Sequence, residues 1–216
     1  MRPRRPRGVS IVELLVGLAL GLFIVAIGLS LLVGRIHEHR ALLLQSRLMQ
    51  DLRVAAEIVT RDLRRAGHWN EANAAIWHGS ASGAAPNPQT ALTTATDTIR
   101  FRFSPTDASA NDSFGFRLHG GSIEMLLGDG AWQALTDSGS VVVTAFHVSP
   151  RLQEIALHGF CANPCPSGAP QCLPRQQVRS VAVTISGRAV ADGSVVRTLR
   201  SEVRLRNDAI VGRCPA

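Results

Sequence analysis

The sequence contains no lysine and no tyrosine, and aromatic residues make up only 5% of its 216 residues. All 23 basic residues are therefore arginine, and against 16 acidic residues they give a formal net charge of +7. Four arginines precede Gly8, and without them the balance is 19 basic against 16 acidic residues, a net charge of +3. The positive charge is thus largely a feature of the N-terminus and is weak evidence for nucleic-acid binding.

Spacings that would support catalysis or metal binding are also missing. The sequence shows no nucleophile–base pair and no paired carboxylates suited to acid–base chemistry, and "HGSASG" lacks the G-x-S-x-G pattern of serine hydrolases. The cysteines do not form the paired C-x-x-C knuckles of structural zinc sites. We therefore expect no catalytic residues, no metal and no cofactor, and a protein that is not an enzyme.

A run without charge lies close to the N-terminus. The 21 residues from Leu14 to Gly34 contain no charged side chain. A helix of that length spans about 30 Å, which is the thickness of the hydrocarbon core of a bilayer. Because arginines crowd the preceding segment, the N-terminus is expected to stay in the cytoplasm while the rest of the chain is exported.

Glu13 directly precedes this run, and a simple membrane segment does not explain it. A secretory signal would have a shorter apolar core and a small-x-small cleavage site, whereas "RIHEHRA" follows the run here. A plain single-pass anchor would gain nothing from a carboxylate, which costs a few kcal/mol within lipid. That cost falls at the edge of the bilayer, so an interfacial carboxylate is a further interpretation.

The segment "RGVSIVELLVGLALG" resembles the class III signal of type IV pilins and pseudopilins. That signal consists of a basic leader, a glycine, an apolar residue, Ser or Thr, two aliphatic residues, a glutamate and an apolar helix. The resemblance implies that a prepilin peptidase removes the cytoplasmic leader 1–8 by cutting between Gly8 and Val9, and then methylates Val9. Glu13 becomes the fifth mature residue. Val9 departs from the family pattern, in which phenylalanine is usual at this position.

Cleavage at this point would give the carboxylate a partner. The new amine of Val9 and the carboxylate of Glu13 are four residues apart and share one helical face. In a filament, the glutamate of one subunit can instead meet the amine of its neighbour. Either pairing keeps the charge compensated in apolar surroundings, so we expect Glu13 to register one subunit against the next.

Apolar residues continue at helical spacing beyond the membrane segment, in steps of three and four. They form one stripe: Leu44, Leu48, Leu52, Ala55, Val59 and Leu63. The pattern predicts an amphipathic helix over about 36–66 that ends before Gly67, and one long helix over 9–66 with its transmembrane part at about 14–34. Two helices broken near Gly34 are the alternative. The segment "LQSRLMQDLRVAAEIVTRDLRRAGHW" resembles the same region of PilW-type minor pilins.

Residues 67–216 are expected to form an exported globular domain. Residues 70–97 show no sustained period and are interpreted as a surface loop. Residues 122–136 contain a Gly-Asp-Gly turn and predict a hairpin, while "QVRSVAVTISG" and "GSVVRTLRSEVRLRND" alternate apolar and polar residues and predict the last one. The remaining predicted strands cover 98–103, 114–119, 140–148 and 152–160, the last two as a pair.

No sustained helical period follows residue 66. The predicted fold class is therefore α+β, with a long N-terminal helix packed against a C-terminal antiparallel β-sheet. This layout resembles minor pilins and secretion pseudopilins, in which a final hairpin similar to "VRSVAVTISGR" and "RSEVRLRN" closes the sheet. The resemblance implies a pilin-like fold.

The four cysteines lie in a Pro-rich insert at 161–172 and near the C-terminus: Cys161, Cys165, Cys172 and Cys214. An even number of cysteines in an exported domain predicts disulfides. We expect Cys214 to join one insert cysteine, with the other two closing the insert, and the three connectivities that fit this description stay open. The alternative is a zinc site made of His158 and the three insert cysteines, which an oxidising compartment disfavours.

The pilin resemblance implies a structural role in assembly: a minor pilin that initiates or tips a type IV pilus. It implies other minor pilins and the major pilin as partners through the N-terminal helix, prepilin peptidase as the processing enzyme, and a tip adhesin as a candidate partner. The chain would sit in the bacterial inner membrane with its globular domain in the periplasm, and later at the cell surface. The alternative is a minor pseudopilin of a type II secretion system.

A DNA-binding pilus subunit is a third hypothesis. It rests on arginines in or beside the predicted strands: Arg100, Arg102, Arg117, Arg179, Arg188, Arg197, Arg200, Arg204 and Arg206. Ordinary solvation of strand faces explains the same residues. We favour that explanation, so nucleic acid is not expected among the partners.

Overall fold

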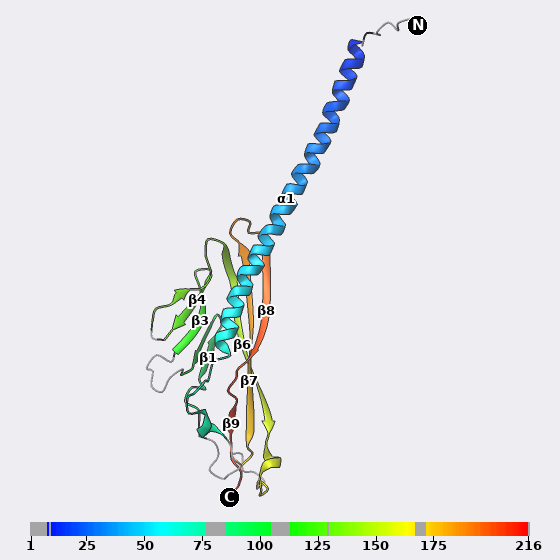
Figure 1. The fold of residues 1–216 in the computed structure, drawn as a ribbon. Coiled ribbons are helices and arrows are strands. Elements are labelled where there is room, and N and C mark those ends of the chain that lie inside the picture. Colours follow the sequence, from blue (N-terminus) through cyan, green and yellow to red (C-terminus); the bar gives the residue numbers. More distant parts are fainter. Residues whose placement is uncertain are drawn as a thin grey trace, which may run out of the picture. The chain divides into compact units, whose positions relative to one another are not determined.

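The computed structural model describes Gly8 and the ranges 10–76, 85–104, 113–128, 130–166 and 172–215. The chain forms two compact units, Met1–Leu44 and Gln45–Ala216. Helix α1 covers Ile11–Leu63, blue to cyan in Figure 1, and its residues belong to both units. The fold is α+β, with a long N-terminal helix and antiparallel β-structure in the second unit.

The end of α1 follows the pattern predicted from the sequence. Leu63 is the last helical residue, three residues before the predicted end, and a turn leads to Gly67. Gly67 has a φ of 77°, the left-handed conformation that glycine adopts without a steric penalty. Its amide donates to the carbonyl of Arg102 at 2.8 Å, so the end of the helix is attached to a strand rather than left to solvent.

The second unit contains two antiparallel sheets, where the sequence predicted one. The first sheet has five strands in the order β1-β2-β3-β4-β5. Its strands are β1 (Leu92–Ala95), β2 (Thr98–Arg102), β3 (Ser113–His119), β4 (Ser122–Leu127) and β5 (Gln133–Ala134). The predicted 122–136 hairpin is present as β4 and β5, although β5 is only two residues long.

The second sheet is built around one long central strand. Its strands are β6 (Val141–Ala156), β7 (Arg175–Ala189), β8 (Val196–Arg204) and β9 (Ala209–Val211). Strand β6 pairs with the whole length of β7, while β8 and β9 both pair with β7 at different parts of its length (Figure 1). The last predicted hairpin is confirmed as β7 and β8.

Strand β6 corrects the prediction of two paired strands at 140–148 and 152–160. It is one continuous strand, with Pro150 opposite Val181 and a bulge between Val143 and Ala145. Proline has no amide hydrogen and is therefore normally excluded from strand interiors. An edge strand tolerates it because one side of its backbone makes no ladder hydrogen bonds, and β6 is an edge of the β6-β7-β8 order.

The predicted loop over 70–97 is also wrong in part. It contains a short 3-10 helix, η1 (Ala72–Ala75), and strand β1, which pairs with β2. Strand β1 is four residues long, lies at the edge of its sheet and is mostly exposed, so it lacks the alternation that marks a half-buried strand. Strand β9 was missed because three residues are too few to show a period.

One core joins the second part of α1 to both sheets. The predicted apolar stripe is buried from Leu48 to Leu63, whereas Leu44 is partly exposed. The sheets contribute buried side chains: Ile99, Phe101, Phe116, Ile123, Val143, Phe146, Val181, Val183, Ile185 and Val203. Burial of each large aliphatic or aromatic side chain contributes about 1.5–3 kcal/mol, so this stripe is the main attachment of the helix to the sheets.

Gly187 on β7 allows the helix to approach closely. A Cβ atom at this position would lie 3.2 Å from Leu52 Cδ2 on the helix, 3.1 Å from Val141 Cγ2 and 3.3 Å from the carbonyl oxygen of Val142. The contact with Leu52 comes from the helix, and the contacts with Val141 and Val142 come from β6. A side chain at this position therefore requires Leu52, Val141 or the backbone of Val142 to shift by a few tenths of an ångström.

We predict that Gly187→Ala destabilises the second unit by about 1 kcal/mol. The lost glycine flexibility favours alanine in a strand by up to about 1 kcal/mol, but overpacking costs about 1–3 kcal/mol, so the clash prevails. Denaturant unfolding of the detergent-solubilised chain, followed by tryptophan fluorescence, measures the difference. Gly159→Ala is the matched control because a Cβ there has no neighbour within 4 Å. An equal effect of the two substitutions would show that Gly187 is not a close-packed position.

Candidate functional site

The first part of α1 presents an apolar surface that the chain does not cover. The segment Ile11–Leu32 is long and apolar enough to cross a membrane, a property that a signal sequence shares. It begins three residues before the predicted span and includes Glu13. Every side chain in it is exposed, and none is covered by any residue that the structure describes. Lipid or other helices must therefore bury this surface if it is to leave water.

The start of α1 places Glu13 at a defined position. The amide of Leu14 donates to the carbonyl of Ser10 at 3.1 Å, which makes Ser10 the residue that precedes the helix, and Glu13 lies in the first turn. Ser followed three residues later by Glu is the spacing of a capping box, a signal that the sequence analysis missed. The positive end of the helix dipole also favours a carboxylate here. Local helix chemistry and the expected amine therefore both favour Glu13.

The structure places the processing residues only in part. Gly8 is exposed, and no atom would lie within 4 Å of a Cβ at that position. Val9 and residues 1–7 lie outside the described residues, so cleavage and methylation at Val9 stay predictions. Gly8 and Glu13 belong to one short exposed segment at the start of the chain.

Three glycines leave one face of the apolar helix open. Gly17, Gly21 and Gly28 are spaced by four and seven residues, which puts them on the same side of the helix. A Cβ at any of the three would have no neighbour within 4 Å. Small residues at such positions let two helix backbones approach closely in an apolar environment.

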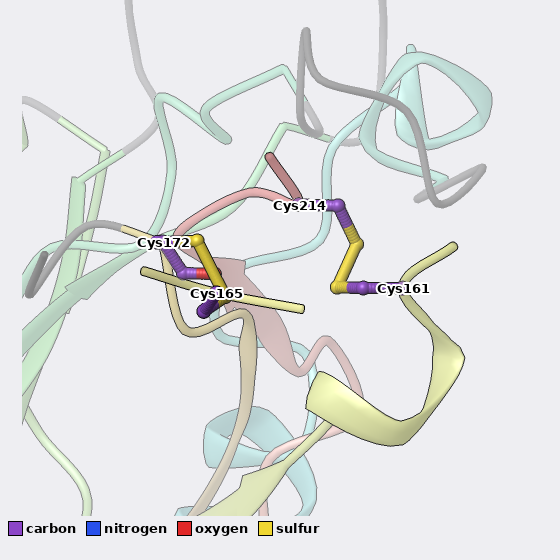
Figure 2. Close-up of a disulfide and its surroundings, with 4 residues drawn as sticks. All are labelled: Cys161, Cys165, Cys172 and Cys214. Carbon is purple, nitrogen blue, oxygen red and sulfur yellow. A yellow bond between two sulfur atoms is a disulfide. The ribbon is translucent and has the colours of Figure 1, made fainter. Parts of the chain in front are cut away.

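Two disulfides lie in the segment between β6 and β7, and one of them binds this segment to the C-terminus. Figure 2 shows Cys161 joined to Cys214 and Cys165 joined to Cys172. The Cα atoms of the pairs are 5.4 Å and 5.6 Å apart, within the usual range. The expectation of disulfides is confirmed, and the structure identifies Cys161 as the partner of Cys214, a choice that the sequence left open. The bridges also consume the thiols that the alternative zinc site at His158 would need.

The nine arginines of the DNA-binding hypothesis do not all lie on one sheet. Arg117 pairs with Glu124 at 2.6 Å, and its guanidinium lies 4.4 Å from the centre of the Trp132 ring. On the second sheet, Arg204 pairs with Asp208 at 2.6 Å. The nine residues are divided between the first sheet (Arg100, Arg102, Arg117), the second sheet (Arg179, Arg188, Arg197, Arg200, Arg204) and the segment after β8 (Arg206). Several therefore have structural contacts of their own.

A comparison with protein families supplies the family. The model described as PpdB, prepilin peptidase-dependent protein B, matches residues 41–205. The chain belongs to this family. The match begins after the apolar segment, so it is independent of the signal at residues 7–13, and the two together identify a pilin-related protein. The chain matches no curated protein and no solved structure.

We predict that the two disulfides differ in their contribution to stability. The bridge between Cys161 and Cys214 closes a loop with a sequence separation of 53, and the bridge between Cys165 and Cys172 one of 7. Loop-closure entropy gives about 4 kcal/mol for the first and about 2 kcal/mol for the second. The double variants Cys161→Ala/Cys214→Ala and Cys165→Ala/Cys172→Ala, compared by denaturant unfolding, serve as controls for each other. A larger loss of unfolding free energy in the Cys165→Ala/Cys172→Ala variant would contradict this expectation.

Proposed function

We propose that this protein is a minor pilin that takes part in the assembly of a type IV pilus. In this proposal a prepilin peptidase cuts between Gly8 and Val9 and methylates the new N-terminus. Before assembly, the mature chain resides in the inner membrane, with its N-terminus at the cytoplasmic side and its sheet domain in the periplasm. From there it joins other minor pilins in the complex that starts or tips the filament.

One observation carries the proposal. The uncovered apolar part of α1 begins directly after the predicted cleavage point, with Glu13 in its first turn. An ordinary anchor needs the apolar surface but not the carboxylate. A subunit that moves from lipid into a bundle of pilin helices needs both. The PpdB family, named for its dependence on prepilin peptidase, supports the same processing step for this chain.

The free energy of burying the apolar segment is much larger than the cost of placing the Glu13 carboxylate in the membrane. Burial of the large aliphatic side chains between Ile11 and Leu32 gains tens of kcal/mol in total, whereas one carboxylate near the membrane edge costs a few kcal/mol at most. Glu13 therefore does not prevent insertion. Its effect appears in the filament, where an unpaired carboxylate among packed helices is costly and a paired one is not. Glu13 thus selects the register in which it meets the N-terminal amine of a neighbouring subunit.

The open face of the helix supports the same mechanism. Gly17, Gly21 and Gly28 allow another helix to pack against the backbone. The globular domain would then project from the bundle and set the contacts with neighbouring subunits. The role proposed is structural, without a catalytic residue, and the proposed partners are the other minor pilins, the major pilin and the peptidase.

We predict that Glu13→Gln leaves insertion into the membrane unchanged but lowers incorporation into filaments about tenfold or more. A charge-assisted hydrogen bond contributes about 1.5–3 kcal/mol, and 1.4 kcal/mol corresponds to a factor of ten. The measurement compares the amount of the protein in sheared filaments with the amount in the membrane fraction.

Glu38→Gln is the matched control for this experiment. Glu38 is an exposed glutamate on the same helix, outside the apolar segment, and lies 3.6 Å from Arg35. The same chemical change there should leave incorporation within twofold of the wild type. Normal incorporation of Glu13→Gln, with insertion intact, would remove subunit registration from the proposal.

A further inference from the structure

A cleft in the exported domain has no role in the assembly mechanism described above. It has a volume of about 580 Å³, a size typical of ligand sites. One wall is formed by Trp69 and by residues 85–87 and 90, and the other by β7, β9 and the segment between β8 and β9. All of these residues belong to the second unit.

The cleft exists because β7 changes its partner. Strand β8 pairs with β7 as far as Ser180, opposite Arg204, and β9 pairs with it again from Gln177, opposite Ala209. Between them the chain leaves the ladder over residues 205–208. Arg179 lies at this gap, where its carbonyl accepts from the amide of Leu205 at 2.9 Å.

The gap leaves positive charge in the cleft. Arg179 donates from Nη1 to the carbonyl of Thr90 at 2.7 Å and from Nη2 to the carbonyl of Asn207 at 3.0 Å, both uncharged acceptors. Burial lowers the pKa of Arg179 from its usual value, an effect that the nearby carboxylate of Asp208 opposes. Arginine nevertheless stays protonated at any pH at which the protein is folded.

The acidic residue of the cleft, Asp208, lies near Arg179 but makes its ion pair with another arginine. Oδ2 of Asp208 accepts from Arg204 Nη2 at 2.6 Å and from Gln176 Nε2 at 2.7 Å, so its charge is matched by Arg204. Arg206 is exposed, lines the same cleft and makes no ion pair with any residue that the structure describes. Arg179 and Arg206 are therefore two guanidinium groups in one cleft without a carboxylate of their own.

Further polar groups at this site also remain unsatisfied. Nε of Arg179 and Oδ1 of Asp208 are buried and have no hydrogen-bond partner within the described ranges. Buried polar groups of native proteins nearly always have partners, so each exception calls for a reason. The unsatisfied Nε belongs to Arg179, so this guanidinium still has a donor to offer beyond its two bonds to backbone carbonyls.

We propose that this cleft binds a carboxylate carried by an extended peptide segment of another polypeptide. Guanidinium groups form paired hydrogen bonds with carboxylates, which fits the uncompensated charge of Arg179 and Arg206. A peptide is favoured over a small anion because β9 lines the cleft and pairs, among described residues, with β7 alone. Its open side can accept an added strand, while Trp69 supplies an apolar wall for a neighbouring side chain.

The test uses three tripeptide probes and the full chain in detergent micelles, with binding measured by isothermal titration calorimetry at low salt. The probes are acetyl-Ala-Asp-Ala-amide, acetyl-Ala-Asn-Ala-amide and acetyl-Ala-Ala-Ala with a free C-terminal carboxylate. The proposal predicts that a carboxylate probe binds about tenfold or more tightly than the Asn probe. The stronger of the two carboxylate probes tells whether the partner supplies a side chain or a chain end.

Arg206→Gln is the decisive variant because the Arg206 side chain is exposed, lines the cleft and makes no ion pair with a described residue. It should weaken binding of the carboxylate probe about tenfold, whereas Arg200→Gln, an exposed arginine on β8 outside the cleft, should change it less than twofold. If neither carboxylate probe binds more tightly than the Asn probe, or if the two variants have equal effects, the proposal is overturned. Acetate binding as well as the peptides would overturn the peptide part of it. None of these outcomes bears on processing at Gly8 or on registration by Glu13.

Discussion

The apolar surface of Ile11–Leu32 is the constraint on which the rest of this protein depends. None of its side chains is covered by the described part of the chain, so in water this apolar surface would stay exposed to solvent. Burial of this surface in lipid or among other helices gains far more free energy than a single glutamate costs. The apolar residues therefore require surroundings other than water, and in the proposed mechanism Glu13 distinguishes lipid from a bundle of helices.

In the second unit, the apolar residues of the same helix are buried by the chain itself. From Leu48 onward the apolar stripe is buried against two sheets, and Gly187 lets the helix approach β7 closely. Two disulfides lie beyond the far ends of β6 and β7, and one of them attaches the C-terminal segment there. The described residues contribute few buried side chains in this region. The core of this unit is therefore formed by its own residues, which is compatible with the proposed position of the domain outside the membrane.

Periodicity made some elements predictable and left others out of reach. The stripe on α1 and the alternation along β7 and β8 repeat over many residues, so both were found from the sequence. Strand β6 was divided in two because Pro150 signals a break, and the sequence does not reveal that β6 is an edge strand. The separation into two sheets depends on long-range pairing, which leaves no local pattern.

The candidate sites show the same division. The cleavage signal and Glu13 are local motifs, and the sequence alone predicted them. The pairing of four cysteines required the positions of their Cα atoms, since spacing left three connectivities open. The cleft at Arg179 arises from a change of strand partner along β7, and Arg179 looked like any other strand arginine in the sequence.

The central claim is that the mature protein begins at Val9, so that a new amine faces Glu13. Mass spectrometry of the N-terminal peptide, released from the protein purified from membranes, tests this most directly. The account predicts a peptide that starts at Val9 and carries an N-methyl group. A peptide that retains the leader 1–8, or a mature chain that begins after residue 34, would contradict it.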